Sequence, residues 1–171
     1  ADYSKAGKGD GASATQSRWL PSAKAAFLLL CCARLLSARL NVVADCDEVF
    51  NYWEPLHYLL YGYGLQTWEY SSKFALRSYL YLLAHIPVAG PAAIWLGTHA
   101  GKARVFFLTR GALGLCSSAC EATVYRAALS HGGPYLAGYL LIFLLFSSGM
   151  FMATTAMLPS TFTMGGLMLA M

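Results

Sequence analysis

Residues 127–171 read AALSHGGPYLAGYLLIFLLFSSGMFMATTAMLPSTFTMGGLMLAM and contain no Asp, Glu, Lys or Arg. An uncharged apolar run longer than about 18 residues is typical of a membrane-spanning helix. Over all 171 residues the hydrophobic fraction is 57%, the charged fraction is 12% and the mean hydropathy is +0.49. Soluble domains carry about 25% charged residues. The composition therefore excludes a water-soluble globule and a disordered chain, and predicts an all-α polytopic membrane protein.

Working outward from this run, the apolar segments predict four membrane spans and part of a fifth. They are expected at about 20–43, 78–96, 105–129 and 135–157, with Pro159 ending the fourth and residues 160–171 beginning another. The first span contains Arg34 and Arg39. A central Arg costs about 2.5–3.5 kcal/mol on insertion scales, so it usually faces a bundle interior or a wet cavity, or reaches the interface. Partner helices outside this chain are therefore expected.

The charges change sign in blocks along the chain. Residues 1–39 carry a net charge of +4, residues 40–72 carry −5, and residues 73–110 carry +5. The bases form no contiguous patch, and the composition does not fit a soluble nucleic-acid-binding domain. Both features argue against nucleic-acid binding. Cytoplasmic loops are enriched in Lys and Arg. The basic tail and the Lys102/Arg104 turn are therefore predicted to be cytoplasmic, with the acidic block on the opposite side of the membrane.

The polar segment between the first two expected spans is residues 45–78, DCDEVFNYWEPLHYLLYGYGLQTWEYSSKFALRS. Pro55 suits the first turn of a helix and Gly62 suits its C-terminal stop, so a short helix is predicted over residues 54–61. This helix is too short to cross a bilayer. Its aromatic content favours a position at the membrane surface.

Three carboxylates, Asp45, Asp47 and Glu48, follow directly after the first expected span. A carboxylate at such a place can act as a general base and remove a proton from a hydroxyl nucleophile. The alternative is that three acids in a solvated loop only mark the non-cytoplasmic side. Their spacing alone leaves both interpretations open.

The whole segment resembles the signature of glycosyltransferase family 22, the lipid-phosphomannose-dependent mannosyltransferases of the endoplasmic reticulum. The matching elements are the acidic pair Asp47-Glu48, the GxG turn Gly62-Tyr63-Gly64, the TWEY run Thr67-Trp68-Glu69-Tyr70 and the pair Arg77-Ser78. DCDE followed by FNYWEP and HYL is most similar to the α-1,2 branch of asparagine-linked glycosylation. Other branches begin the motif with HPDE or a Glu-Glu pair. One departure is Ser72-Lys73, where the family commonly has Pro after the Ser of TWEYS.

The resemblance implies a GT-C-like glycosyltransferase transmembrane bundle, of which this chain is one part. Residues 1–18 are rich in Gly, Ala, Ser and Lys and are expected to form a disordered cytoplasmic tail. Residues 19–171 would be the N-terminal part of a multi-spanning mannosyltransferase domain, with a lumenal catalytic loop at about 44–77 that contains the short interfacial helix. The implied location is the endoplasmic reticulum membrane. Because the chain stops within an apolar run, we expect a fragment that is inactive alone.

The reaction implied by the resemblance is an inverting transfer of mannose. The donor would be dolichyl phosphate mannose, and the acceptor would be a mannose 2-hydroxyl of the dolichol-linked oligosaccharide, giving an α-1,2 bond. Both lipid-linked substrates and membrane lipid are the expected partners. No cofactor or metal ion is expected, because side chains can neutralise the departing phosphate.

The resemblance also suggests roles for individual residues. Asp47 is the expected base and Glu48 the alternative, because the first acid of the pair matches a carboxylate in the other branches of the family. Arg77 is expected to bind the lipid phosphate, as a guanidinium can do bidentately, although it could equally be an interfacial anchor. The candidates for sugar contacts are Trp53, Glu54, Trp68, Glu69 and Tyr70.

Two other functions fit parts of the pattern. A mannosyltransferase acting on GPI anchors would belong to the same family. A transporter or channel subunit would explain charged residues inside membrane helices, but its functional groups would be expected near the bilayer midplane in broken helices. This sequence instead concentrates acids and aromatics in one loop, which favours an enzyme.

Overall fold

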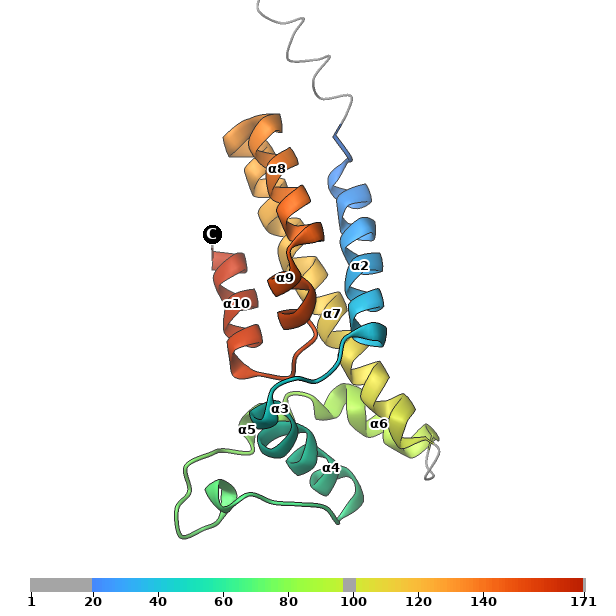
Figure 1. Ribbon diagram of the computed structural model, residues 1–171, viewed down its shortest axis with the longest axis vertical. Coiled ribbons are helices and arrows are strands. Elements are labelled where there is room, and N and C mark those ends of the chain that lie inside the picture. The colour runs from blue at the N-terminus through green and yellow to red at the C-terminus, as the bar shows by residue number, and fades with distance from the viewer. Residues whose placement is uncertain (1–19, 97–100, 171) are drawn as a thin grey trace, which may run out of the picture.

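The computed structural model describes residues 20–96 and 101–170. Figure 1 shows an elongated molecule with a bundle of helices at one end and a group of short helices and loops at the other. The bundle consists of α2 (Ala23–Leu40), α7 (Lys102–Ala127), the π-helical turn η4 (Ala128–Gly132), α8 (Gly133–Phe146), α9 (Ser148–Ala153) and α10 (Pro159–Ala170). No strand occurs among the described residues, in agreement with the predicted all-α class.

The second group of elements follows α2 and contains the polar segment. It comprises α3 (Cys46–Glu48), the π-helix η2 (Val49–Trp53), α4 (Glu54–Tyr61), the 3₁₀ turn η3 (Trp68–Tyr70), α5 (Leu80–Leu83) and α6 (Ile86–Leu96). A buried apolar cluster that includes Tyr52, Leu56, Leu82 and Met157 joins this group to the bundle. The loop-rich group is therefore packed onto the end of the bundle.

The two long helices α2 and α7 run antiparallel, and a buried ion pair joins them. Arg34 Nε donates to Glu121 Oε1 at 3.0 Å, and both side chains are fully buried. Arg34 Nη2 also donates to the carbonyl of Leu144 in α8, at 2.5 Å. The expectation that Arg34 needs a partner helix outside this chain is wrong, because the acid lies 87 residues further along the same chain.

A second buried cation, Arg110 in α7, connects the end of α2 with the α9–α10 linker. Its Nη1 donates to the carbonyl of Asn41 at 2.8 Å, and its Nη2 donates to Thr155 Oγ1 at 3.1 Å. Ser37 Oγ shares a 3.2 Å hydrogen bond with the same Thr155 hydroxyl. These bonds bring three parts of the chain together where the bundle meets the polar segment.

Gly114 lets α2 and α7 approach closely, and we expect Gly114→Ala to destabilise the protein. An added Cβ would lie 3.2 Å from Arg34 Cβ and 3.3 Å from the Arg34 carbonyl oxygen, which as backbone cannot move aside easily. Overpacking of about 1–3 kcal/mol should exceed the helix-propensity gain of about 1 kcal/mol. The measurement is the free energy of unfolding in detergent. Gly111→Ala is the matched control, because its Cβ would meet nothing closer than Leu35 at 3.7 Å.

If Gly114→Ala and Gly111→Ala lower the free energy of unfolding equally, the close packing of α2 against α7 at Gly114 is not the cause of the destabilisation.

One helical stretch in the described part of the chain, Lys102–Phe146, is long and apolar enough to cross a membrane. It has 45 residues, more than the ~20 that a bilayer core requires. Gly133, with φ of +81° and ψ of 175°, interrupts the helical backbone within it. Arg34 contacts α7 through Glu121 and α8 through Leu144, and Figure 1 shows α8 returning beside α7.

Two predicted spans are wrong as single helices. Residues 78–96 are divided into α5 and α6, because Pro87 lacks the N–H that would continue α5 into the next turn. Helix α6 has 11 residues and so is about 16 Å long, against ~30 Å for the hydrocarbon core. Residues 135–157 are also divided, because Ser147 has extended backbone and caps α9. The helix before Pro159 ends at Ala153, and Pro159 begins α10.

The short α6 changes the predicted sidedness. Because α6 does not run the length of the bundle, the chain enters α7 at the same end of the molecule as the polar segment. Lys102 Nζ lies 4.8 Å from the ring centre of Tyr61 and 4.3 Å from that of Tyr63. The prediction that the Lys102/Arg104 turn lies opposite the acidic block is therefore wrong. The predicted tail, residues 1–18, falls outside the described residues.

Candidate functional site

The acidic motif lies at the start of one continuous helical segment formed by α3, η2 and α4. The predicted helix over residues 54–61 is confirmed, with Pro55 in its first turn and Gly62 in the left-handed region at its C-cap, with φ of +75°. The segment begins earlier than predicted, at Cys46, because Asp45 acts as an N-cap. Asp45 Oδ1 accepts the backbone N–H of Asp47 at 2.9 Å.

Pro55 explains why the middle of this segment is a π-helix and how the TWEY run attaches to it. Proline has no N–H, and its ring crowds the carbonyl four residues earlier, which is that of Asn51. The widened turn is closed by the N–H of Glu54, which donates to the Val49 carbonyl. The Tyr70 hydroxyl donates to the Asn51 carbonyl at 2.6 Å. Tyr70 thus donates to the carbonyl that would accept the N–H of residue 55 in a regular α-helix, an N–H that Pro55 lacks.

Asp47 is exposed and is linked by hydrogen bonds to the TWEY run. Its Oδ1 accepts from Asn51 Nδ2 at 3.1 Å, and Asn51 Oδ1 accepts from Thr67 Oγ1 at 3.0 Å. Asn51 comes four residues after Asp47, a spacing that puts the two side chains on one helical face. The Asp47 carboxylate is therefore oriented by the protein while remaining accessible.

Glu48 has the opposite environment, with 4% of its surface exposed. Its Oε1 accepts two N–H groups at 2.9 Å, the indole N–H of Trp53 and the backbone N–H of Met157. Met157 lies in the linker between α9 and α10. Glu48 thus attaches the acidic motif to the helical bundle.

Arg77 forms a cluster with Glu69 and Tyr52. Its Nε forms an ion pair with Glu69 Oε2, its Nη1 donates to the Tyr52 hydroxyl, and its guanidinium lies 5.3 Å from the Tyr52 ring centre. Burial lowers the pKa of Arg77, but the hydrogen bond with Glu69 and the nearby charges, including that of Asp47, raise it above its ordinary value. Arg77 therefore remains a cation near the exposed carboxylate.

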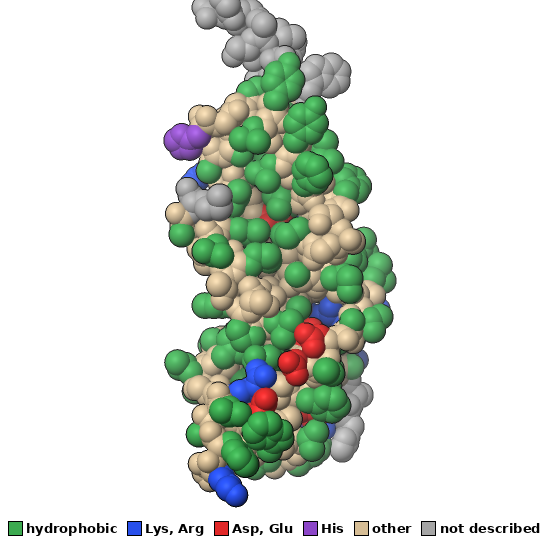
Figure 2. All heavy atoms as spheres, turned by 60° about the vertical axis from the view of Figure 1, so that its left-hand side comes forward, with side chains coloured by type: hydrophobic (Ala, Val, Ile, Leu, Met, Phe, Trp, Pro, Cys, Tyr) green, Lys and Arg blue, Asp and Glu red, His purple; other side chains and the backbone are tan. Residues whose placement is uncertain are grey.

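Tyr70 completes this cluster as a neutral hydrogen-bond donor. Burial, reinforced by neighbouring acidic groups, raises its pKa to about 12. Its ring centre lies 4.8 Å from that of Tyr79. Figure 2 shows acidic and basic side chains gathered on the lower part of the surface and bordered by hydrophobic side chains.

The structure brings together four of the eight predicted site residues, namely Asp47, Glu69, Tyr70 and Arg77. Glu48 lies beneath this surface cluster. Trp68 is 59% exposed and packs edge-on against Phe74, with ring centres 5.2 Å apart.

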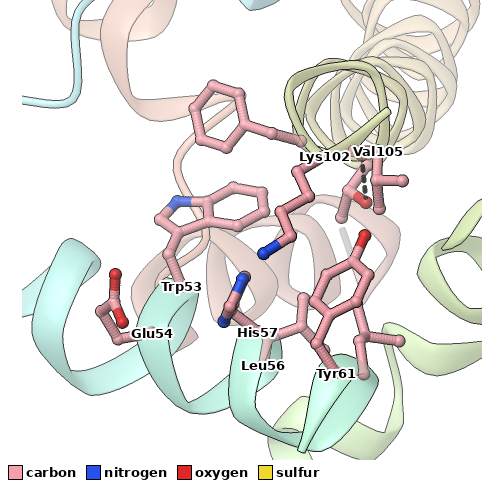
Figure 3. A pocket seen from close by; sticks show the side chains of 10 residues that line it. Trp53, Glu54, Leu56, His57, Tyr61, Lys102 and Val105 are labelled. Carbon is pink, nitrogen blue, oxygen red and sulfur yellow. Dashed lines mark hydrogen bonds between the residues drawn. The ribbon is translucent and has the colours of Figure 1, made fainter. Parts of the chain in front are cut away.

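Trp53 and Glu54 lie elsewhere, at a cavity of about 150 Å³ between α4 and α7. Figure 3 shows Trp53, Tyr61 and Lys102 around this cavity, with the Glu54 carboxylate directed away from it. Glu54 Oε2 accepts the N–H of Leu65 at 3.3 Å, which helps to hold the loop after Gly62.

Four further residues at or near the site were not among the predicted site residues, namely Asn51, Tyr52, Thr67 and Lys102. The spacing of Asn51 from Asp47 was a usable signal, because residues four apart share a helical face. Tyr52 acts through Arg77, 25 residues further along the chain, so no local pattern marks it, whereas Thr67 belongs to the TWEY run. No group of three or more His, Cys, Asp or Glu side chains that could hold a metal ion occurs among residues 20–96 and 101–170.

Comparison with known proteins extends the likeness beyond the polar segment. The chain is 47% identical over 163 residues to "Alpha-1,2-mannosyltransferase ALG9" of Arabidopsis thaliana, covering 94% of this chain and 27% of the relative. It is 46% identical over 153 residues to the protein of the same name from Homo sapiens, covering 90% and 25%. Identity to that of Saccharomyces cerevisiae is 37% over 141 residues, covering 81% and 25%.

The chain thus spans about a quarter of the length of these relatives. No solved structure matches it. Residues 25–171 match a family of mannosyltransferases, over a range that includes the carboxylates, the TWEY run, Arg77 and the helices that hold them. On these grounds the chain belongs to the Alg9-like mannosyltransferase family.

Proposed function

We propose that the full-length protein transfers mannose in α-1,2 linkage to the dolichol-linked oligosaccharide used for protein N-glycosylation. The proposed donor is dolichyl phosphate mannose, and the proposed place is the endoplasmic reticulum membrane. The observation that carries this proposal is the cluster of Asp47, Glu69, Tyr70 and Arg77. Asn51 is hydrogen-bonded to Asp47 and Tyr70, and Arg77 is paired with Glu69. It combines an exposed carboxylate with a paired cation and aromatic rings, the groups that sugar transfer from a phosphate requires.

Asp47 is the proposed general base. Its carboxylate is exposed and accepts one oriented hydrogen bond through Oδ1. A carboxylate so placed can take the proton of the acceptor hydroxyl as that oxygen attacks the anomeric carbon. Glu48 is less suited to the role, because it is buried and its Oε1 already accepts two N–H groups. We assign Glu48 to positioning the loop.

Arg77 is the proposed partner of the lipid phosphate. Its Nη2 makes no hydrogen bond to any residue in the described part of the chain, whereas Nε and Nη1 are held by Glu69 and Tyr52. The two held nitrogens orient the guanidinium, and the remaining one can donate to a phosphate oxygen. In an inverting displacement the leaving phosphate departs opposite the attacking hydroxyl, so the cation and the base serve opposite sides of the sugar. No step of this scheme requires a metal ion or a cofactor.

Trp68 is the strongest candidate for a sugar platform, because its ring is exposed, follows Thr67 of the site in the chain and is held by a T-shaped contact with Phe74. Glu69 and Tyr70 would contribute by orienting Arg77 and Asn51. Trp53 and Glu54 are assigned to the loop's own structure. We also propose that the loop faces the lumen and the N-terminal tail faces the cytoplasm, which is supported by α2 running from one end of the bundle to the other.

The test uses cells that lack their own α-1,2-mannosyltransferase of this pathway and accumulate a truncated lipid-linked oligosaccharide. Expression of the full-length protein should restore the missing mannose residues in the dolichol-linked pool. A stable, membrane-inserted protein that restores nothing would overturn the proposal. Restoration of GPI-anchor mannosylation instead would favour the other branch of the family. Family membership argues against a transporter or channel subunit.

A further inference from the structure

Arg110 in α7 is a buried cation with no part in the transfer scheme proposed for Asp47 and Arg77. It is 2% exposed. The ion pairs in the described part of the chain are Arg34–Glu121 and Arg77–Glu69, so Arg110 forms none there. Its Nε is buried and makes no hydrogen bond within residues 20–96 and 101–170. Burying a cation on such terms costs free energy, so the stability of the bundle alone does not account for it.

One hydrogen bond of Arg110 fixes the point where the chain leaves the bundle for the acidic motif, residues 45–48. Its Nη1 donates to the carbonyl of Asn41, the C-cap of α2, at 2.8 Å. Four residues later Asp45 caps the motif and accepts the N–H of Asp47. A shift at Asn41 would therefore move the start of the segment that carries Asp47.

A second hydrogen bond of Arg110 holds the linker between α9 and α10. Its Nη2 donates to Thr155 Oγ1 at 3.1 Å, and Thr155 lies two residues before Met157. The N–H of Met157 donates to Glu48 Oε1 at 2.9 Å. Arg110 therefore steadies the linker that holds Glu48, the residue next to Asp47.

The face of the guanidinium supports Glu48 through two aromatic rings. It lies 5.4 Å from the ring centre of Phe106, which is 4.6 Å from that of Trp53. The indole N–H of Trp53 donates to Glu48 Oε1 at 2.9 Å. The negative charge of Glu48 also interacts favourably with Arg110. Three separate contacts of one buried cation thus converge on the acidic motif.

We propose that Arg110 is a positioning residue for mannosyl transfer, which holds the Asp47 carboxylate where it can reach the acceptor hydroxyl. This inference rests on the proposed function and on Asp47 as the base. A catalytic group displaced by about 1 Å can lose about 10²-fold in rate. Loss of Arg110 should lower kcat and leave KM unchanged, because Arg77 and Trp68, the proposed substrate contacts, belong to other parts of the loop.

The first test is Arg110→Met in the full-length protein, with kcat and KM measured for mannose transfer to a lipid-linked acceptor. We expect kcat to fall about 10–10²-fold at constant KM. Arg34→Met is the matched control, because Arg34 is also a buried guanidinium but contacts Glu121 and the Leu144 carbonyl, away from the motif. It should keep kcat per folded molecule. An equal fall of kcat in both variants, or a change in KM alone, would overturn the inference.

A double-variant cycle shows whether Arg110 acts through Asp47. In protein that already carries Asp47→Asn, the further change Arg110→Met should lower the residual rate less than about twofold, because the base that Arg110 positions is absent. The same fold-loss with and without Asp47→Asn would show a general structural effect and would reject a positioning role.

A milder variant tests the same contacts if Arg110→Met does not fold. Thr155→Val removes the hydroxyl that Arg110 holds but keeps the cation, and should lower kcat at least about threefold. Ser37→Ala is its control, because Ser37 is the other partner of that hydroxyl. Ser37→Ala should keep kcat. Equal rates in the two variants would contradict the role of Arg110.

Hydrogen exchange of the backbone amides of residues 46–53 provides a readout that does not need transfer. Relative to the rest of the bundle, exchange there should be at least about tenfold faster in Arg110→Met and unchanged in Arg34→Met. Normal transfer with unchanged exchange in Arg110→Met would reject this inference alone. Faster exchange in Arg110→Met, when the unchanged protein transfers no mannose, would reject only the proposed function.

Discussion

Asp47→Asn is expected to abolish mannosyl transfer while leaving the fold intact. The introduced amide could still accept the hydrogen bond from Asn51 through its carbonyl oxygen, but an amide cannot take a proton from the acceptor hydroxyl. Loss of a general base typically lowers kcat about 10²–10⁴-fold. The measurement is the rate of mannose transfer by the purified full-length protein to a lipid-linked acceptor, with KM and kcat determined separately.

Two neighbouring acids provide matched controls for Asp47. Asp45→Asn removes the same charge two residues away but keeps the N-cap, because Asn caps helices as well as Asp does. Glu48→Gln can still accept both N–H groups through its carbonyl oxygen. Both variants should keep most of the activity. An active Asp47→Asn protein together with an inactive Glu48→Gln protein would show that Glu48, not Asp47, is the base.

Arg34→Met is expected to destabilise the helical bundle by about 3–5 kcal/mol, the cost of leaving one buried charge without its partner. Glu121 would remain fully buried and would lose both hydrogen bonds from the guanidinium. Arg39→Met is the matched control in the same helix. Arg39 is exposed and lies 5.5 Å from the Phe107 ring centre, a contact worth about 0.5–1 kcal/mol. The readout is the free energy of unfolding in detergent.

The double variant Arg34→Met/Glu121→Met distinguishes a lost ion pair from lost packing. Removing both charges leaves no buried ion, so most of the stability should return, and the two single effects should not add. A double variant as unstable as the sum of the singles would show that the side-chain shapes, rather than the opposite charges, hold α2 to α7.

Much of the local structure could be predicted from neighbouring residues. The bounds of α4 followed from Pro55 and Gly62, because each constrains the backbone at its own position. The first bundle helix followed from its apolar run. The predicted spans at 78–96 and 135–157 were wrong as single helices because they were inferred from apolar composition alone. Apolar composition reports what a segment can bury, but Pro87 and Ser147 interrupt the helical hydrogen bonds within it.

The sequence by itself determined the helical class, the family motifs and which acidic, basic and aromatic residues are candidates for the site. These depend on composition and on short spacings along the chain. Only the tertiary structure decided how those residues differ. Asp47 and Glu48 are adjacent acids, yet Met157, 109 residues after Glu48, makes Glu48 a buried anchor and leaves Asp47 exposed. Lys102 likewise lies at the polar segment because α6 is short. A charge's role depends on its solvation and partners, and partners this distant in the chain meet only when the helices pack.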